Sequence, residues 1–270
     1  ESPWGPGRPG WHIECSAMST CCLGDTFDIH GGGPDLPFPH HENEIAQSES
    51  ATGKKYVHYW MHAGAVRVDN EKMSKSLNNF FTIREVLKKY HPEVVRYFLL
   101  SSHYRSPINY SEENLIEAKG GLDRFYTALL PFTEVAPAAL DTLHASDYYR
   151  RFVESMDDDF NTRDALAAMY DLVRDMNTCA KTDPAQAAKL AAELKALGGV
   201  FGIFTVEPKT FLQGIASDGP DAEQIETLIA ERVAAKKNRD FARADQIRDD
   251  LAAQGVVLED SREGTTWRRE

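Results

Sequence analysis

The chain has 270 residues, of which 42% are hydrophobic and 27% are charged, and its formal net charge is −12. This composition is ordinary for a globular protein, and the length allows two or three domains. An acidic surface repels phosphate backbones, which argues against general affinity for nucleic acid but leaves room for a local basic patch. No apolar run approaches the roughly 20 residues that cross a bilayer, and no signal-peptide pattern is present, so we expect no membrane association.

The cysteines are few, and their spacing does not indicate a disulfide framework. They are Cys15, Cys21, Cys22 and Cys179. In a chain of this length, such usage is typical of a protein of the reducing cytoplasm. We expect Cys21, Cys22 and Cys179 to be small buried apolar residues.

Helical and extended segments alternate from about residue 11 to residue 110. The expected elements are, in chain order, a helix at 11–23, a strand at 26–30, a tight glycine loop at 31–35, a helix at 39–50, one or two strands within 56–68, a polar stretch at 69–79 and a helix at 82–90. Such alternation predicts a parallel, Rossmann-like sheet.

After residue 110 the chain becomes rich in Ala, Leu, Glu, Lys and Arg, with apolar residues at helical spacing. We expect a bundle of four or five helices over 111–202, with breaks at Asp183-Pro184 and at Gly198-Gly199, and a linker at 212–220. The sequence after this linker predicts one long helix over 221–253, which Gly255 ends. Two short strands are expected to follow, at 256–258 and 265–269, around a turn at 263–264.

Cys15, His40 and Glu44 form the first group of residues with a defined chemistry. A thiolate, an imidazole and a carboxylate are all zinc donors, and His40 and Glu44 are four residues apart, on one face of the expected helix. Three protein ligands suit an open site or a site that lacks a fourth ligand. His41 could take the place of His40, and a free cysteine beside a solvated polar helix face is the competing interpretation.

Two further motifs point to a nucleotide. Lys72 and Lys75 belong to the string Lys-Met-Ser-Lys-Ser in the polar stretch, and a mobile loop can bring two lysines to a polyphosphate as charge develops. The glycines at 31–33, followed by Asp35, close the strand at 26–30, where a nucleotide can approach the backbone. A solvated Lys/Ser turn and a plain glycine turn are the structural alternatives.

Three strings in one order carry a resemblance. They are Gly-Trp-His-Ile-Glu-Cys-Ser-Ala-Met at 10–18, the stretch 30–49 that starts His-Gly-Gly-Gly-Pro-Asp and contains Phe-Pro-His-His-Glu-Asn-Glu, and Glu-Lys-Met-Ser-Lys-Ser-Leu at 71–77. Together they resemble the bacterial cysteinyl-tRNA synthetases, which are class I enzymes. The likeness continues through Met-Asp-Asp-Asp-Phe-Asn-Thr at 156–162 to Gly-Thr-Thr-Trp-Arg-Arg at 264–269, and so covers almost the whole chain.

The resemblance implies a cysteine–tRNA ligase, which uses ATP with Mg²⁺ to form cysteinyl-adenylate from L-cysteine and then charges tRNA(Cys). In this family one zinc ion is held by two cysteines, a histidine and a glutamate, and it binds the substrate thiol. Cys15, His40 and Glu44 match three of these ligands. The second cysteine and a His-Ile-Gly-His type string have no counterpart among the 270 residues. We therefore expect a chain that lacks the N-terminal half of the catalytic domain and does not form the adenylate alone.

Further site residues are implied by the same resemblance. The expected ATP contacts are Lys75, supported by Lys72, with Gly31, Gly32, Gly33 and Asp35 beside the adenylate. Trp11 and His30 are expected on the cysteine side. Trp267, Arg268 and Arg269 are expected to contact tRNA, because Trp stacks on unpaired bases and Arg binds phosphate. The alternative for the basic residues is that they are solvated and paired with nearby acids.

We therefore expect an α/β Rossmann-like partial catalytic domain at 1–110, an α-helical anticodon-binding bundle at 111–212 and a small α+β tRNA-binding domain at 213–270, in a cytoplasmic monomer. Two other interpretations stay open. One is a tRNA-binding fragment without catalysis. The other is a cysteine ligase of mycothiol biosynthesis, against which the segment 212–270 argues.

Overall fold

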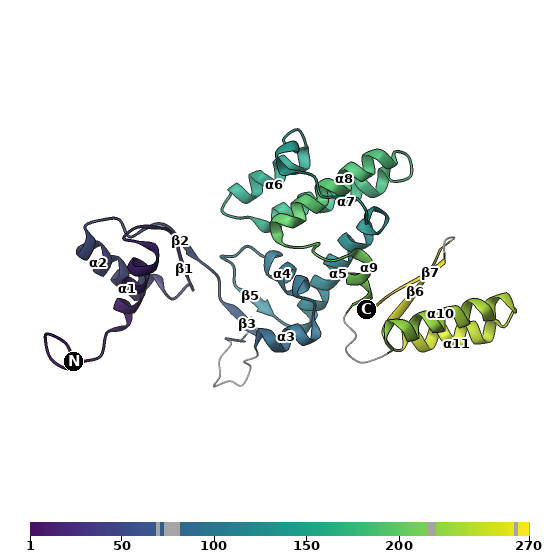
Figure 1. Ribbon diagram of the computed structural model, residues 1–270, viewed down its shortest axis with the longest axis horizontal. Coiled ribbons are helices and arrows are strands. Elements are labelled where there is room, and N and C mark those ends of the chain that lie inside the picture. Colours follow the sequence, from purple (N-terminus) through teal and green to yellow (C-terminus); the bar gives the residue numbers. More distant parts are fainter. Residues whose placement is uncertain (69–70, 73–81, 215–219, 262–263, 270) are drawn as a thin grey trace. The chain divides into compact units, whose positions relative to one another are not determined.

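The computed structural model describes residues 1–68, 71–72, 82–214, 220–261 and 264–269 (Figure 1). It divides into two compact units, one made of residues 1–73 and 102–110 and the other of residues 74–101 and 111–270. Within the described residues, no helix combines the length and the apolar character needed to span a bilayer. All four cysteines are free, and Cys21 and Cys22 are exposed on the first helix rather than buried as predicted.

The described residues of the first unit form two helices and two small sheets. Its elements are α1 (Trp11–Leu23), β1 (Phe27–Gly32), the π-helical turn η1 (Pro37–His41), α2 (Glu42–Thr52), β2 (Val57–His62), β3 (Val66–Val68), β4 (Glu71–Lys72) and β5 (Ile108–Tyr110). The strands β1 and β2 pair in parallel, and β3 pairs in parallel with β5 and antiparallel with β4. The predicted parallel pairing is therefore present, but it is divided between two sheets of two and three strands.

The helix predicted at 39–50 begins later than expected. Phe38 has φ −130° and ψ 132°, outside the helical region, and α2 starts at Glu42 after the turn η1. The cause is local, because proline pushes the residue before it into an extended conformation and Pro39 follows Phe38. His40 thus belongs to the turn, whereas Glu44 belongs to the first turn of α2.

The second unit is built mainly of helices. Within residues 82–214 they are α3 (Ile83–Lys89), α4 (Pro92–Leu100), α5 (Glu112–Leu129), α6 (Asp147–Asp157), α7 (Thr162–Cys179), α8 (Pro184–Phe201) and α9 (Pro208–Gln213), with short 3₁₀ turns η3 (Leu130–Phe132) and η4 (Leu140–Thr142). The core between α5, α7 and α8 includes the fully buried Leu122, Met169 and Leu194. Ser111 caps α5, since its hydroxyl accepts a hydrogen bond from the backbone N–H of Asn114 at 3.2 Å.

The break predicted at Gly198-Gly199 is wrong. Helix α8 continues through both glycines to Phe201 and ends at Gly202, whose φ is +66°. A Cβ atom at Gly198 would lie 2.1 Å from the ring of Phe204. The glycine there allows the close approach of an aromatic ring and does not interrupt the helix.

The single helix predicted over 221–253 is also wrong. Two helices form a hairpin, α10 (Ala222–Lys237) and α11 (Phe241–Ala252) (Figure 1). Between them Arg239 has φ +63°, and Asp240 caps α11 by accepting a hydrogen bond from the Arg243 N–H at 3.1 Å. Asn and Asp favour helix ends over helix interiors, which explains the break.

A two-stranded antiparallel sheet completes this part of the chain. Its strands are β6 (Val256–Ser261) and β7 (Gly264–Arg269), and Leu258 lies opposite Trp267. Gly255, with φ +70°, precedes the sheet as expected. The hairpin and the sheet share one hydrophobic core, formed by Ile225, Ile229, Ile247, Leu251, Val256 and Trp267.

Candidate functional site

The carboxylate of Glu44 is the centre of a polar cluster in the first unit. Glu44 on α2 is only 3% exposed, and its Oε2 atom lies 2.9 Å from Nε2 of His30 on β1. This contact lacks hydrogen-bond geometry, so the buried oxygen has no hydrogen-bond partner among the described groups. A buried carboxylate oxygen in this state is unfavourable unless a cation compensates it.

Cys15 on α1 lies beside the same carboxylate. Burial is the main cause that raises the pKa of the Cys15 thiol, and the charge of Glu44 raises this pKa further. The thiol is therefore held protonated by its surroundings. A metal ion at this position would reverse that preference, because a cation stabilises the thiolate.

His41 completes the cluster around Glu44. His41 is 4% exposed, and its Nδ1 atom lies 2.9 Å from Nε2 of His62. Burial, and then the neighbouring His30, lower the pKa of His41, which favours the neutral imidazole that binds metals. Ligand atoms of His30, His41 and Glu44 all lie within 4.8 Å of one another, a spacing suited to one metal ion.

The predicted set of Cys15, His40 and Glu44 does not come together in this way within the described residues. His40 lies in η1, where its Nδ1 atom is 3.0 Å from Nε2 of His12 and its ring centre is 5.3 Å from that of Trp11. His40 is thus paired with His12 and does not belong to the group of His30, His41 and Glu44. The residues present still fit a zinc ion, since one carboxylate oxygen is unsatisfied and thiol and imidazole donors surround it.

The glycines predicted at the adenylate have close neighbours in the structure. Gly31 and Gly32 belong to β1 instead of the expected loop. A Cβ atom at Gly32 would lie 2.9 Å from Cε1 of His41, and one at Gly33 would lie 2.9 Å from Oδ1 of Asp35. Gly32 therefore admits the ring of His41. Lys72 belongs to β4, and Lys75 lies outside the described residues.

Trp267, which is predicted to contact tRNA, is buried in the structure and does not present an exposed ring. It is 6% exposed within the core of its region, and its Nε1–H donates a hydrogen bond to Oε1 of Glu226 at 2.9 Å. Arg269 is likewise engaged, because it donates to the carbonyl of Pro220 at 2.6 Å and lies over the Trp267 ring. Arg268 is held by Glu259 at 3.2 Å, in a pair of partly exposed side chains.

Phe241 is an exposed aromatic residue that sequence reasoning missed. It is the first residue of α11 and is 61% exposed. Lys237 and Arg239 lie four and two residues before it in the sequence. The signal was available in Asn238 and Asp240, which mark a helix end, but the prediction of one long helix placed Phe241 in a helix interior.

Comparison with known families assigns three regions of the chain. Residues 1–120 match the model of the tRNA synthetases class I (C) catalytic domain, and residues 151–205 match the DALR domain. Residues 221–268 match the Cysteinyl-tRNA ligase anticodon binding domain.

Several curated relatives are named as cysteine–tRNA ligases. The chain is 63% identical over 268 residues to the cysteine–tRNA ligases of Azotobacter vinelandii and Stutzerimonas stutzeri, covering 99% of this chain and 57% of each relative. It is 64% identical over 267 residues to that of Chromohalobacter salexigens, covering 98% of this chain and 57% of the relative. The chain thus spans a little over half the length of these relatives.

A solved structure supports the fold. The LeuRS chain of the LeuRS–tRNA–LeuAMS ternary complex of Agrobacterium radiobacter matches 64% of this chain and 25% of its own length, with a TM-score of 0.50 and 20% sequence identity. A class I catalytic region, a DALR domain and a cysteine-specific anticodon domain follow one another here at high identity to curated relatives, so the chain belongs to the cysteinyl-tRNA synthetase family.

Proposed function

We propose that this chain serves cysteine–tRNA ligation, in which L-cysteine is activated by ATP with Mg²⁺ and transferred to tRNA(Cys). The observation that carries the proposal is the buried Glu44 carboxylate, whose unsatisfied oxygen lies among a thiol and imidazoles. Such a donor set suits a soft cation that recognises a sulfur-containing substrate. The relatives that share 63% identity are named for this reaction.

Glu44 and Cys15 would hold the zinc ion together with one imidazole. The resemblance favours His40 for this role, whereas the geometry favours His30 or His41. When bound, zinc supplies a soft Lewis acid that coordinates the substrate thiolate and so separates cysteine from serine, which a purely steric pocket discriminates poorly. The contact of the buried His41 with the half-buried His62 orients the imidazole beside Glu44.

The remaining substrate contacts are proposed from the family motifs. Trp11, which is 70% exposed, and His30 would line the cysteine side. Lys75 and Lys72 would neutralise the ATP phosphates as charge develops. Asp35 and the backbone at Gly31, Gly32 and Gly33 would border the adenylate.

We propose that residues 1–110 hold the amino acid and ATP, that 111–212 form the anticodon-binding bundle, and that 213–270 form the terminal tRNA-binding domain of a cytoplasmic monomer. The exposed ring of Phe241 supports a stacking contact with an unpaired base, and Arg268 supports a phosphate contact. The four free cysteines fit a reducing compartment.

A tRNA-binding protein without catalysis is the second candidate. A cysteine ligase of mycothiol biosynthesis is disfavoured, because residues 221–268 match a domain described as binding an anticodon.

The test measures zinc content, cysteine binding by calorimetry and tRNA binding by filter retention on the same protein. Ligation predicts bound zinc, binding of cysteine but not serine, and preference for tRNA(Cys) over another tRNA. Binding of tRNA without zinc or cysteine would instead support the second candidate. We expect no cysteine-dependent pyrophosphate exchange from these 270 residues alone.

A further inference from the structure

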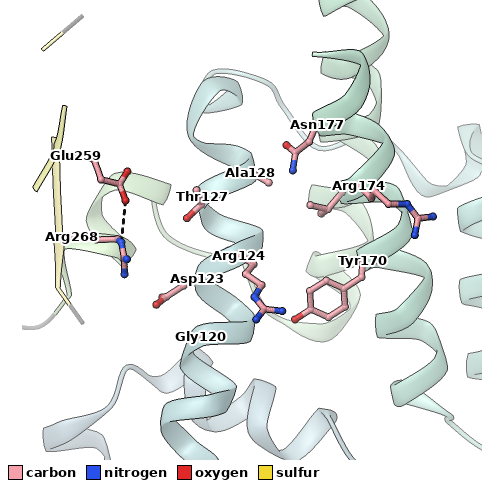
Figure 2. Close-up of a pocket in the computed structure, with 11 residues that line it drawn as sticks. Gly120, Asp123, Arg124, Thr127, Ala128, Tyr170, Arg174, Asn177, Glu259 and Arg268 are labelled. Atoms are coloured by element: carbon pink, nitrogen blue, oxygen red, sulfur yellow. Dashed lines mark hydrogen bonds and ion pairs between the residues drawn. The ribbon is translucent and has the colours of Figure 1, made fainter. Parts of the chain in front are cut away.

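A pocket of about 710 Å³ lies between α5, α7 and the β6–β7 sheet (Figure 2). This volume is within the range of about 300–1,000 Å³ that is usual for ligand sites. Helix α7 lies in the region that matches the DALR domain, whereas β6 and β7 lie in the region that matches the anticodon binding domain. The pocket therefore joins two regions that both belong to the tRNA-binding part of the proposed function.

Arg124 provides an uncompensated positive charge in this pocket. Its side chain is exposed and extends from α5 toward Tyr170 on α7 (Figure 2). No hydrogen bond or ion pair to it is found among the residues that the structure describes. The chain has a net charge of −12, so acidic partners for arginine are plentiful. A guanidinium without such a partner in a pocket is suited to bind the anion of a ligand.

Each of the two acidic side chains that line the pocket has a basic partner. Asp123 accepts a hydrogen bond from Nζ of Lys119 at 2.9 Å, and Glu259 is paired with Arg268 at 3.2 Å. The latter pair is partly exposed, and exposed ion pairs of this kind contribute only about 0–1 kcal/mol. Arg268 can therefore leave Glu259 and bind a stronger anionic partner without a large loss of stabilising free energy.

The wall of the pocket is fixed by a hydroxyl pair. The hydroxyl of Tyr170 lies 2.6 Å from that of Tyr97 and 3.2 Å from the carbonyl oxygen of Gly121. Tyr170 is thus engaged and holds α7 against α4 and α5. The side chains of Thr127 and Asn177 lie at the same pocket and add polar groups next to Arg124.

We propose that this pocket binds the phosphodiester backbone of RNA, with Arg124 as the principal donor and Arg268 as the second. The inference rests on the proposed tRNA-binding function and extends it to the junction of the two regions. A backbone phosphate carries no base identity, so the pocket positions the RNA and adds affinity for any tRNA.

The test compares Arg124→Gln with Arg163→Gln in the full chain by filter binding at several salt concentrations. Arg163 is an exposed arginine of α7 that does not line the pocket. We expect Arg124→Gln to weaken binding of tRNA(Cys) and of an unrelated tRNA alike, by roughly three- to tenfold, and to lower the salt slope by about one. Arg163→Gln should match the unaltered chain.

A substitution that should strengthen tRNA binding instead of weakening it makes the test more stringent. Glu259→Gln removes a carboxylate from the pocket and releases Arg268, so we expect tighter binding of both tRNAs. Circular dichroism melting checks that each variant is folded. If the unaltered chain binds tRNA(Cys) while Arg124→Gln keeps its affinity and salt slope, the pocket proposal fails and the proposed function stands. If the unaltered chain binds no tRNA, both fail.

Discussion

The guanidinium of Arg232 on α10 donates two hydrogen bonds to the carboxylate of Asp260 on β6, at 2.8 and 2.9 Å. Arg232 is 5% exposed whereas the Asp260 side chain is 47% exposed, and the contact links the sheet to the helical hairpin. Lys236 at 2.8 Å and Thr265 at 2.7 Å donate to the same carboxylate. Together these bonds hold the pKa of Asp260 well below its usual range, with the hydrogen bond from Arg232 as the largest cause.

This geometry predicts a loss of stability in acid. A carboxyl group whose pKa is lower in the folded state contributes its full stabilisation above the unfolded pKa, about 4, and loses it as the pH falls below that value. We expect Asp260→Asn to be less stable at pH 7 by about 1–3 kcal/mol. The variant should also lose less stability than the unaltered chain between pH 4 and pH 2. Thermal melts across that range provide the measurement, and parallel curves would contradict the prediction.

Trp267 and Phe241 should give opposite results when replaced by alanine. Trp267 fills the core between hairpin and sheet, so Trp267→Ala should lower the free energy of unfolding by about 3–5 kcal/mol. Phe241 is exposed, so Phe241→Ala should leave the melting temperature unchanged but weaken tRNA(Cys) binding by about 1–3 kcal/mol if it stacks on a base. Denaturant unfolding and filter binding test the pair. A stable Trp267→Ala variant with weakened tRNA binding would restore the stacking role to Trp267.

Two adjacent glycines of α8 should also respond differently. Gly198→Ala places a methyl group against the Phe204 ring and should destabilise the chain by about 1–3 kcal/mol. A Cβ atom at Gly199 meets nothing within 4 Å, so Gly199→Ala should stabilise the helix by about 0.5–1 kcal/mol. Urea unfolding of both variants checks the sign of each change. Equal effects would mean that Phe204 moves freely away from the helix.

Cobalt substitution can identify the metal ligands. A Co²⁺–thiolate bond gives a charge-transfer band that oxygen and nitrogen ligands lack, so we expect Cys15→Ser to abolish the band. Cys22→Ser, on the exposed side of the same helix, is the matched control and should keep it. His40→Ala, His41→Ala and His30→Ala, compared by metal content, show which imidazole binds. Retention of the band in Cys15→Ser would remove Cys15 from the ligand set.

Local sequence signals predicted most of the helices and strands but not all of the residues at which they begin and end. The helices at 11–23 and 82–90 and the cap at Ser111 were predictable, because periodicity and capping residues act over a few residues. The start of α2 and the course of α8 were not. The first depends on how Pro39 affects Phe38, and the second depends on a ring at Phe204 that fits only against a glycine.

The candidate metal site shows the same division. The residue types were predictable, since Cys15 and Glu44 do lie side by side. The choice between His40 and His41 was not, because it depends on which imidazole the turn at 37–41 directs toward Glu44. Trp267 was assigned to RNA because its string suggested a ligand, whereas its burial depends on a sheet packing onto a hairpin, which no short window reveals.

The turn at Asn238, Arg239 and Asp240 changes the reach of the chain. An unbroken helix over the same 33 residues would extend about 50 Å and would carry the strand pair away from the start of α10. Because the chain instead reverses at Arg239, the strands β6 and β7 pack against the helical hairpin. The two ends of the region therefore lie close together, and the turn of three polar residues forms the far end of the hairpin. That turn is where an inserted peptide or fluorescent label would leave the hydrophobic interior untouched.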